Sequence, residues 1–131
     1  MPYGDATDSE TERIATIILD CAFRLHRKLG PGLLESIYLV CLEYELKKAG
    51  LKVLKQVVLP VVHDGVTLDA GLRLDLLVED RVIVEVKPVE RIIPVFEAQL
   101  LTYLKLTNLK LGLLINFNVE LLKNGIKRII H

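Results

Sequence analysis

The chain has 131 residues, of which 51% are hydrophobic, and its 17 Lys and Arg balance its 17 Asp and Glu. This length fits one domain of ordinary size, and so much apolar sequence without net charge excludes a disordered chain. The neutral total also argues against an ordinary nucleic-acid binder, because such proteins usually carry a basic excess. We expect a flexible tail over residues 1–8 and a single domain over residues 9–131.

The cysteines and the apolar runs narrow the compartment and the cofactors. Cys21 and Cys41 lie in apolar helical patterns, which predicts two buried, reduced thiols. Two cysteines cannot supply the four thiolates of an iron–sulfur cluster. The N-terminus is too acidic and polar for a signal peptide, and every apolar run is far shorter than the roughly 20 residues that span a bilayer. We therefore expect a cytoplasmic protein without an iron–sulfur cluster or a membrane segment.

Two helices are predicted at the start of the chain. Ser9 and Glu12 match a capping box, and apolar residues then recur at helical spacing, which predicts a helix over 9–29. Glycine and proline at 30–32 end this helix. A second apolar stripe predicts a helix over 33–49.

The pattern then changes to that of strands. Period-two and β-branched runs predict strands over 52–62 and 66–78, joined by a His-Asp-Gly turn at 63–65. A short β-branched strand follows over 82–87. Its partner in an antiparallel pair is expected to be the strand over 66–78, because only a short turn separates them.

The last third of the chain predicts a crossover. Pro94 suits the first turn of a helix over 94–107, which is followed by an apolar strand over 109–117 and an edge strand over 126–130. The intervening helix makes the strands over 82–87 and 109–117 parallel neighbours. Their apolar runs suit a sheet covered on both faces, so the expected fold class is α/β, with a mixed sheet flanked by helices.

Three polar residues interrupt these apolar strands: Asp75, Glu85 and Lys87. Glu85 and Lys87 share a face, because side chains alternate along a strand. If residues 79–81 form a three-residue loop, Asp75 lies opposite Glu85, with the two Cβ atoms about 5 Å apart. A two-residue loop would instead pair Asp75 with Val84 and separate the acids. We expect the first register, or a bulge with the same result.

Such an acidic pair predicts a metal site. Two adjacent carboxylates repel each other unless a cation lies between them, and Mg²⁺, with Mn²⁺ as a substitute, prefers oxygen ligands and keeps water for chemistry. Lys87 beside the ion could orient or activate an attacking water, or stabilise charge on a scissile phosphate. The alternative is an ordinary salt-bridged cluster, because D-x9-E-x-K is a short pattern with many chance matches.

These residues carry a resemblance to a known family. Asp75 followed by Glu85-Val86-Lys87 resembles the signature of the PD-(D/E)XK nuclease superfamily. The segment GPGLLESIY at 30–38 resembles the motif that names its small GxxExxY family, with Gly32, Glu35 and Tyr38 at the named positions. AQLLTYL at 98–104 and LGLLINF at 111–117 match the same family, so that the resemblance covers roughly residues 10–131. It implies a restriction-endonuclease-like fold.

The resemblance implies a role for each residue of the motif. Asp75 and Glu85 would ligate the metal, with the Val86 carbonyl as an extra ligand, and Lys87 would be the catalytic lysine. Glu35 matches an additional acid that several exonuclease-like branches use as a metal ligand. The alternative for Glu35 is a simple complement to the positive end of its helix.

Gln99 and Tyr103 lie four residues apart on one helix face and match the Q-x3-Y motif that follows the catalytic strand in those branches. They would position the active site or a nucleic-acid backbone, although an exposed stripe on an amphipathic helix has the same spacing. Tyr38 could equally be a core aromatic. The sequence departs from the superfamily pattern at Leu74, where the name has proline, and at Pro88, where a small residue is common.

The leading hypothesis is therefore a metal-dependent nuclease acting on DNA or RNA. The alternative is a non-catalytic nucleic-acid-binding or regulatory module that retains the fold, and a homodimer is compatible with both. Residues 1–20 carry five acids against one arginine, a net of −4, whereas residues 105–131 carry five Lys and Arg against one Glu, a net of +4. A local basic strip on a neutral protein predicts weak, salt-sensitive binding of nucleic acid by the monomer.

Overall fold

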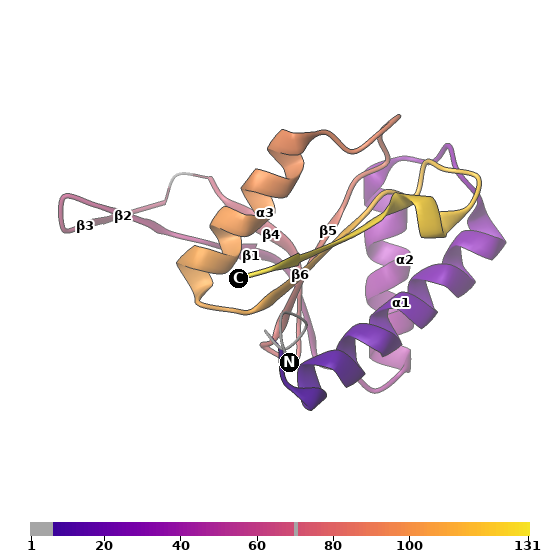
Figure 1. Cartoon of the computed structure of the whole chain (residues 1–131), viewed down its shortest axis with the longest axis horizontal. Coiled ribbons are helices and arrows are strands. Elements are labelled where there is room, and N and C mark those ends of the chain that lie inside the picture. Colours follow the sequence, from indigo (N-terminus) through magenta and orange to yellow (C-terminus); the bar gives the residue numbers. More distant parts are fainter. Residues whose placement is uncertain (1–6, 70) are drawn as a thin grey trace.

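The computed structural model describes residues 7–69 and 71–131, so most of the predicted tail, residues 1–6, lies outside the described residues. A mixed β-sheet lies between two helices on one side and one helix on the other (Figure 1). The elements in chain order are α1 (Ser9–Leu29), α2 (Glu35–Lys48), β1 (Val53–Val58), β2 (Val61–His63), β3 (Val66–Leu68), β4 (Arg73–Val78), β5 (Val82–Val86), α3 (Pro94–Thr107), β6 (Leu111–Ile115), the 3-10 turn η2 (Leu122–Gly125) and β7 (Ile126–Ile130).

The three predicted helices are confirmed, but the cap of α1 differs from the prediction. Asp8, not Ser9, is the N-cap residue, and its side chain accepts a hydrogen bond of 2.7 Å from the Thr11 amide. Asp8 has the extended backbone that a cap needs, whereas Ser9 already lies in the helix. The predicted capping box is therefore wrong by one residue.

The main sheet has the order β1-β4-β5-β6-β7, and β5 and β6 form its parallel pair. This confirms the predicted crossover through α3 and the mixed α/β architecture. In the β4–β5 hairpin, Leu76 pairs with Val84 and Val78 pairs with Val82. That register corresponds to the predicted three-residue turn, in which Glu79 and Asp80 both have a φ of 54°.

The two long strands predicted over 52–62 and 66–78 are each broken in two. β1 pairs with β4, whereas β2 and β3 form a separate two-stranded sheet that extends away from the body (Figure 1). Pro60 lies at the first break and has no amide hydrogen for a strand ladder. At the second break Gly71 has a φ of 82°, and its amide donates to Asp69. Neither conformation continues a regular strand.

Apolar side chains cover both faces of the sheet, as predicted. One core lies under α1 and α2, and a second, smaller core lies under α3. Leu76 belongs to the first core and Leu74 to the second, although residues two apart on a regular strand share a face. The strand therefore changes face at Asp75, and this irregularity is the first structural sign of a site there.

The cysteines agree with the prediction only in part. Cys21 is fully buried, whereas Cys41 on α2 is half-buried. Among the described residues, no helix is long and apolar enough to cross a membrane.

Candidate active site

Asp75 and Glu85 meet where the regular pairing of β4 with β5 stops. The last paired residues on this side are Leu76 and Val84. Beyond them each carboxylate takes the place of a backbone carbonyl: the Asp75 amide donates to Glu85 Oε2 at 2.9 Å, and the Val86 amide donates to Asp75 Oδ2 at 2.8 Å. The two acids are therefore held side by side by reciprocal hydrogen bonds across the hairpin.

The neighbouring strand shows the same irregularity. In the β1–β4 ladder Lys55 pairs with Leu76 and Val57 with Leu74, so Gln56 lies level with Asp75. Gln56 has a φ of 56°, which a residue with a side chain rarely adopts. Such backbone conformations concentrate at functional sites, where the surrounding structure holds them in place.

The pair is buried, and burial changes its acidity. The exposed fraction is 7% for Asp75 and 4% for Glu85. Burial, and then the charge of Asp75, raise the pKa of Glu85 from 4.5 to about 8. Burial also raises the pKa of Asp75, against the hydrogen bond from Val86. Without a cation nearby, Glu85 therefore keeps a proton at neutral pH.

Two of the four carboxylate oxygens remain available. Asp75 Oδ1 and Glu85 Oε1 accept no hydrogen bond from the described residues. No buried side-chain oxygen in that part of the chain lacks a partner, so these two oxygens reach solvent. Paired carboxylate oxygens that open to solvent suit a hard divalent cation, which binds oxygen ligands and retains water. The donor set therefore fits the predicted metal.

Lys87 follows the acids on the same strand and extends toward α3. Its side chain is half-buried, and its ammonium lies 5.5 Å from the centre of the Phe96 ring. Its positive charge lowers the pKa of both Asp75 and Glu85, so the ammonium lies within electrostatic reach of the pair. Contact with an aromatic face holds a lysine without neutralising it, which leaves its charge free to act on a ligand.

Of the two predicted α3 residues, Tyr103 lies near the acids and Gln99 is exposed. Tyr103 is 5% exposed, and burial, followed by the charges of Glu85 and Asp75, raises its pKa. A hydroxyl that stays protonated can donate a hydrogen bond to an anion. Gln99 lies one turn earlier on the helix, with its side chain in solvent.

Glu35, the first residue of α2, approaches the pair from the other helical layer. Its charge raises the pKa of both Asp75 and Glu85. It is exposed, however, and within the described residues no three His, Cys, Asp or Glu side chains converge closely enough to hold one ion. The structure thus brings Asp75, Glu85 and Val86 together and leaves Glu35 at the rim of the site.

Tyr38 fixes the loop from which Glu35 emerges. It is fully buried and stacks on Phe117 at 4.6 Å between ring centroids. Its hydroxyl donates to the Gly30 carbonyl at 2.6 Å and accepts from the Leu33 amide at 3.1 Å. No side chain caps the start of α2, so this clamp takes over the function of a cap and sets where the helix begins.

We expect Tyr38→Phe to lower the free energy of unfolding by about 1–3 kcal/mol, because the Leu33 amide loses its hydrogen-bond partner. Urea unfolding followed by circular dichroism measures this change. Tyr44→Phe on the same helix is the matched control, since Tyr44 is 62% exposed and its hydroxyl can bond to water. Equal stability of the two variants would contradict the clamp.

Sequence reasoning missed Asn116, which organises the segment after Lys87. Asn116 is 1% exposed, and its Oδ1 accepts hydrogen bonds from the amides of Val89 at 3.1 Å and Asn118 at 3.0 Å. It thereby ties the chain that leaves β5 to the chain that leaves β6. The available signal was a lone amide in an otherwise apolar run, the same kind of interruption that identified Asp75 and Glu85.

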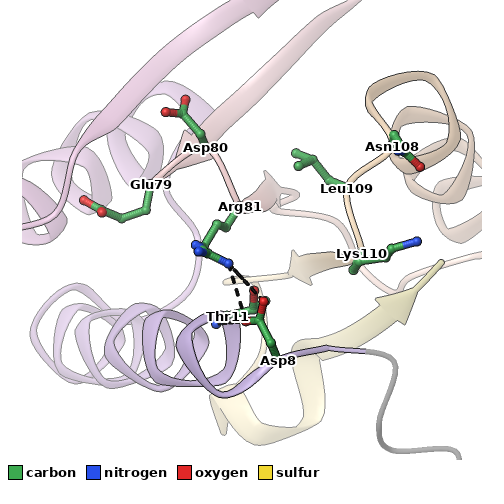
Figure 2. A pocket seen from close by; sticks show the side chains of 8 residues that line it. All are labelled: Asp8, Thr11, Glu79, Asp80, Arg81, Asn108, Leu109 and Lys110. Atoms are coloured by element: carbon green, nitrogen blue, oxygen red, sulfur yellow. Dashed lines mark hydrogen bonds and ion pairs between the residues drawn. The ribbon is translucent and has the colours of Figure 1, made fainter.

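A cavity of about 390 Å³ lies at the opposite end of the sheet and is not part of this site (Figure 2). Arg81 points from the β4–β5 turn toward α1, where it pairs with Asp8 at 3.1 Å and donates to Thr11 at 3.4 Å. The charges around it are largely acidic and partly neutralised. Its lining residues are Asp8, Thr11, Glu79, Asp80, Arg81, Asn108, Leu109 and Lys110.

Comparison with known protein families gives one match. The family described as the PD-(D/E)XK nuclease superfamily matches residues 12–129, nearly the whole chain. Comparisons with curated proteins and with solved structures gave no match. The matched range contains both acids, the lysine, and the helices on either side of the sheet.

Proposed function

The chain belongs to the PD-(D/E)XK nuclease superfamily, and from this we propose that it is a metal-dependent nuclease that hydrolyses phosphodiester bonds in DNA or RNA. Its mixed α/β fold is of the restriction-endonuclease-like kind, and nucleases of this superfamily generally use divalent metal ions. The observation that carries the proposal is the buried, hydrogen-bonded Asp75–Glu85 pair with Lys87 beside it. A solely structural salt bridge would pair these acids with cations, whereas here two like charges adjoin.

In this proposal Asp75, Glu85 and the Val86 carbonyl hold a Mg²⁺ ion, for which Mn²⁺ can substitute, and Glu35 contributes from the rim. The ion supplies charge for the scissile phosphate and a water of lowered pKa. Hard oxygen ligands support this choice of metal. The raised pKa of Glu85 adds support, because a site that repels its own ionisation gains most from a bound cation.

Lys87 and Tyr103 supply the remaining chemistry. The half-buried Lys87 ammonium orients the attacking water or stabilises the charge that develops on the phosphate oxygens. Tyr103 stays protonated beside the acids and donates a hydrogen bond to the bound substrate. Gln99, exposed one turn away, is placed to contact the nucleic-acid backbone.

Within the superfamily, we assign the chain to the GxxExxY family. Its three named residues have separable physical roles here. Gly32 has a φ of 99°, which favours glycine; Glu35 begins α2 beside the acids; and Tyr38 clamps the loop between them. The pattern therefore describes one structural unit that places a carboxylate at the rim of the site.

Titration of the protein with Mn²⁺ in a calorimeter tests the metal site. The ion must displace the proton on Glu85, so we expect affinity to rise up to about tenfold per pH unit between pH 6 and 8, and to level off above. Labelled single- and double-stranded DNA and RNA should then be cut with Mg²⁺ or Mn²⁺, and not with EDTA.

The two measurements separate the proposed function from its alternative. Absence of Mn²⁺ binding at pH 8 would refute the metal site. Mn²⁺ and nucleic-acid binding without cleavage of any of the substrates would instead favour a non-catalytic module that retains the fold.

A further inference from the structure

We propose that a second cavity, between the C-terminal end of α1 and η2, binds one unpaired nucleotide of a nucleic-acid strand whose backbone reaches the acidic pair. The cavity has a volume of about 450 Å³ and is lined by both elements and by the loop that precedes α2. The inference rests on the proposed nuclease function and adds to it a substrate class, a strand with an unpaired base.

The walls of this cavity are apolar. Phe23 of α1 is half-buried against the core, Leu122 is buried at the base, and Leu121 is 57% exposed. An aromatic ring with apolar neighbours is the surface on which a nucleobase stacks, and such stacking is tolerant of sequence.

Cations lie around the same cavity. Arg27 at the end of α1 and Lys123 in η2 line it and are exposed, against one acid, Glu120. On a chain whose net charge is zero this is a local positive excess, and it complements the phosphate that accompanies a base. An apolar peptide would leave both cations without partners, so charge complementarity favours a nucleotide.

The cavity is rigidly linked to the active site. His26, only 7% exposed, lies with its Nε2 2.7 Å from the Val119 carbonyl and thus holds the η2 segment against α1. It is a buried structural residue, not the solvated partner for the last carbonyls of α1 that histidines at helix ends usually are. Gly30 lines the cavity, and its carbonyl accepts from Tyr38, the residue that sets the start of α2.

Both sites therefore lie at one end of the sheet. Asn116 follows β6 and bonds to the segment that leaves β5 after Lys87, and η2 continues from the same end of β6. Figure 1 shows η2 beside the end of α1 and the start of α2. A strand crossing this end of the molecule can meet the cavity and the acidic pair in succession.

Fluorescence anisotropy with a short labelled oligothymidine in EDTA tests the proposal without any cleavage. The double variant Arg27→Ala/Lys123→Ala should bind about tenfold more weakly than the wild type and lower the salt slope by about 2. Lys47→Ala/Lys52→Ala is the control, because it removes two exposed lysines whose ammonium groups pair with Glu43 and Asp80. Its affinity should change less than about twofold.

A second arm isolates the base. An oligonucleotide of the same length without bases keeps the charge of the strand and should bind wild type about tenfold more weakly. Leu121→Glu, at an exposed position, should remove that preference. An oligouridine shows whether the site accepts RNA as well as DNA, and a duplex of the same length should bind more weakly than either single strand.

Three results would overturn the proposal: no strand binding at low salt, equal binding of the strands with and without bases, or equal affinities of the Arg27/Lys123 and Lys47/Lys52 variants. Because EDTA is present throughout, these outcomes are independent of the metal site. A protein that binds the base but no Mn²⁺ retains this cavity and loses the nuclease function; one that binds Mn²⁺ but shows no base preference does the reverse.

Discussion

Lys87→Ala should reduce metal-dependent cleavage by about 100- to 10,000-fold, the usual contribution of a positioned proton-transfer or charge-stabilising group. Mn²⁺ affinity should stay equal or rise. The reason is that the Lys87 ammonium lowers the pKa of Asp75 and Glu85, so that its loss leaves the acids with a greater need for a cation. A large loss of rate without a loss of metal binding is the signature of a catalytic lysine.

The control for this experiment is Lys105→Ala, which removes an exposed lysine from the last turn of α3. Its cleavage rate should remain within about twofold of wild type, since screened surface charges act weakly at a distance. The thermal unfolding of both variants shows whether loss of the Lys87–Phe96 contact disturbs α3. Full cleavage by a folded Lys87→Ala protein would remove Lys87 from the proposed mechanism.

Glu85→Gln should abolish Mn²⁺ binding and cleavage, and yet stabilise the metal-free protein at pH 8. The folded-state pKa of Glu85, about 8, lies above its ordinary value of 4.5. Folding therefore favours the protonated acid: the stability it contributes is complete below about pH 4.5 and is lost as the pH rises through 8. Glutamine cannot ionise, so at pH 8 the variant should gain on the order of 2–5 kcal/mol over wild type.

Urea unfolding of the metal-free proteins at pH 5 and pH 8 measures this difference. Glu90→Gln is the matched control, because Glu90 is exposed in the loop before α3 and its loss should leave the pH dependence of wild type unchanged. Added Mn²⁺ should stabilise wild type and not the Glu85 variant. A Glu85→Gln protein that is no more stable than wild type at pH 8 would show that Glu85 is ionised there.

Much of the site could be predicted from local pattern. The apolar alternation of β4 and β5, together with the length of the turn between them, determined that Asp75 and Glu85 would adjoin, and the register in the structure agrees. Period two likewise placed Lys87 on the face of Glu85. These properties depend on neighbouring residues of one hairpin, so they are visible in a single sequence.

Contacts between distant segments could not be predicted in this way. The break that separates β2 and β3 from β1 and β4 lies in a run that alternates well enough for one long hairpin. The clamp from Tyr38 to Gly30 needs Phe117 behind it. The anchor at Asn116 depends on two strands that lie in parallel.

The sequence by itself determined the order of helices and strands, the acidic pair and its lysine, because these follow from periodicity and turn length. Only the tertiary structure decided how those residues behave. It buried Glu85 until its pKa rose to about 8, placed Lys87 over Phe96, and left Glu35 at the rim of the site. Burial and electrostatic environment are sums over segments far apart in the chain, and only folding brings those segments together.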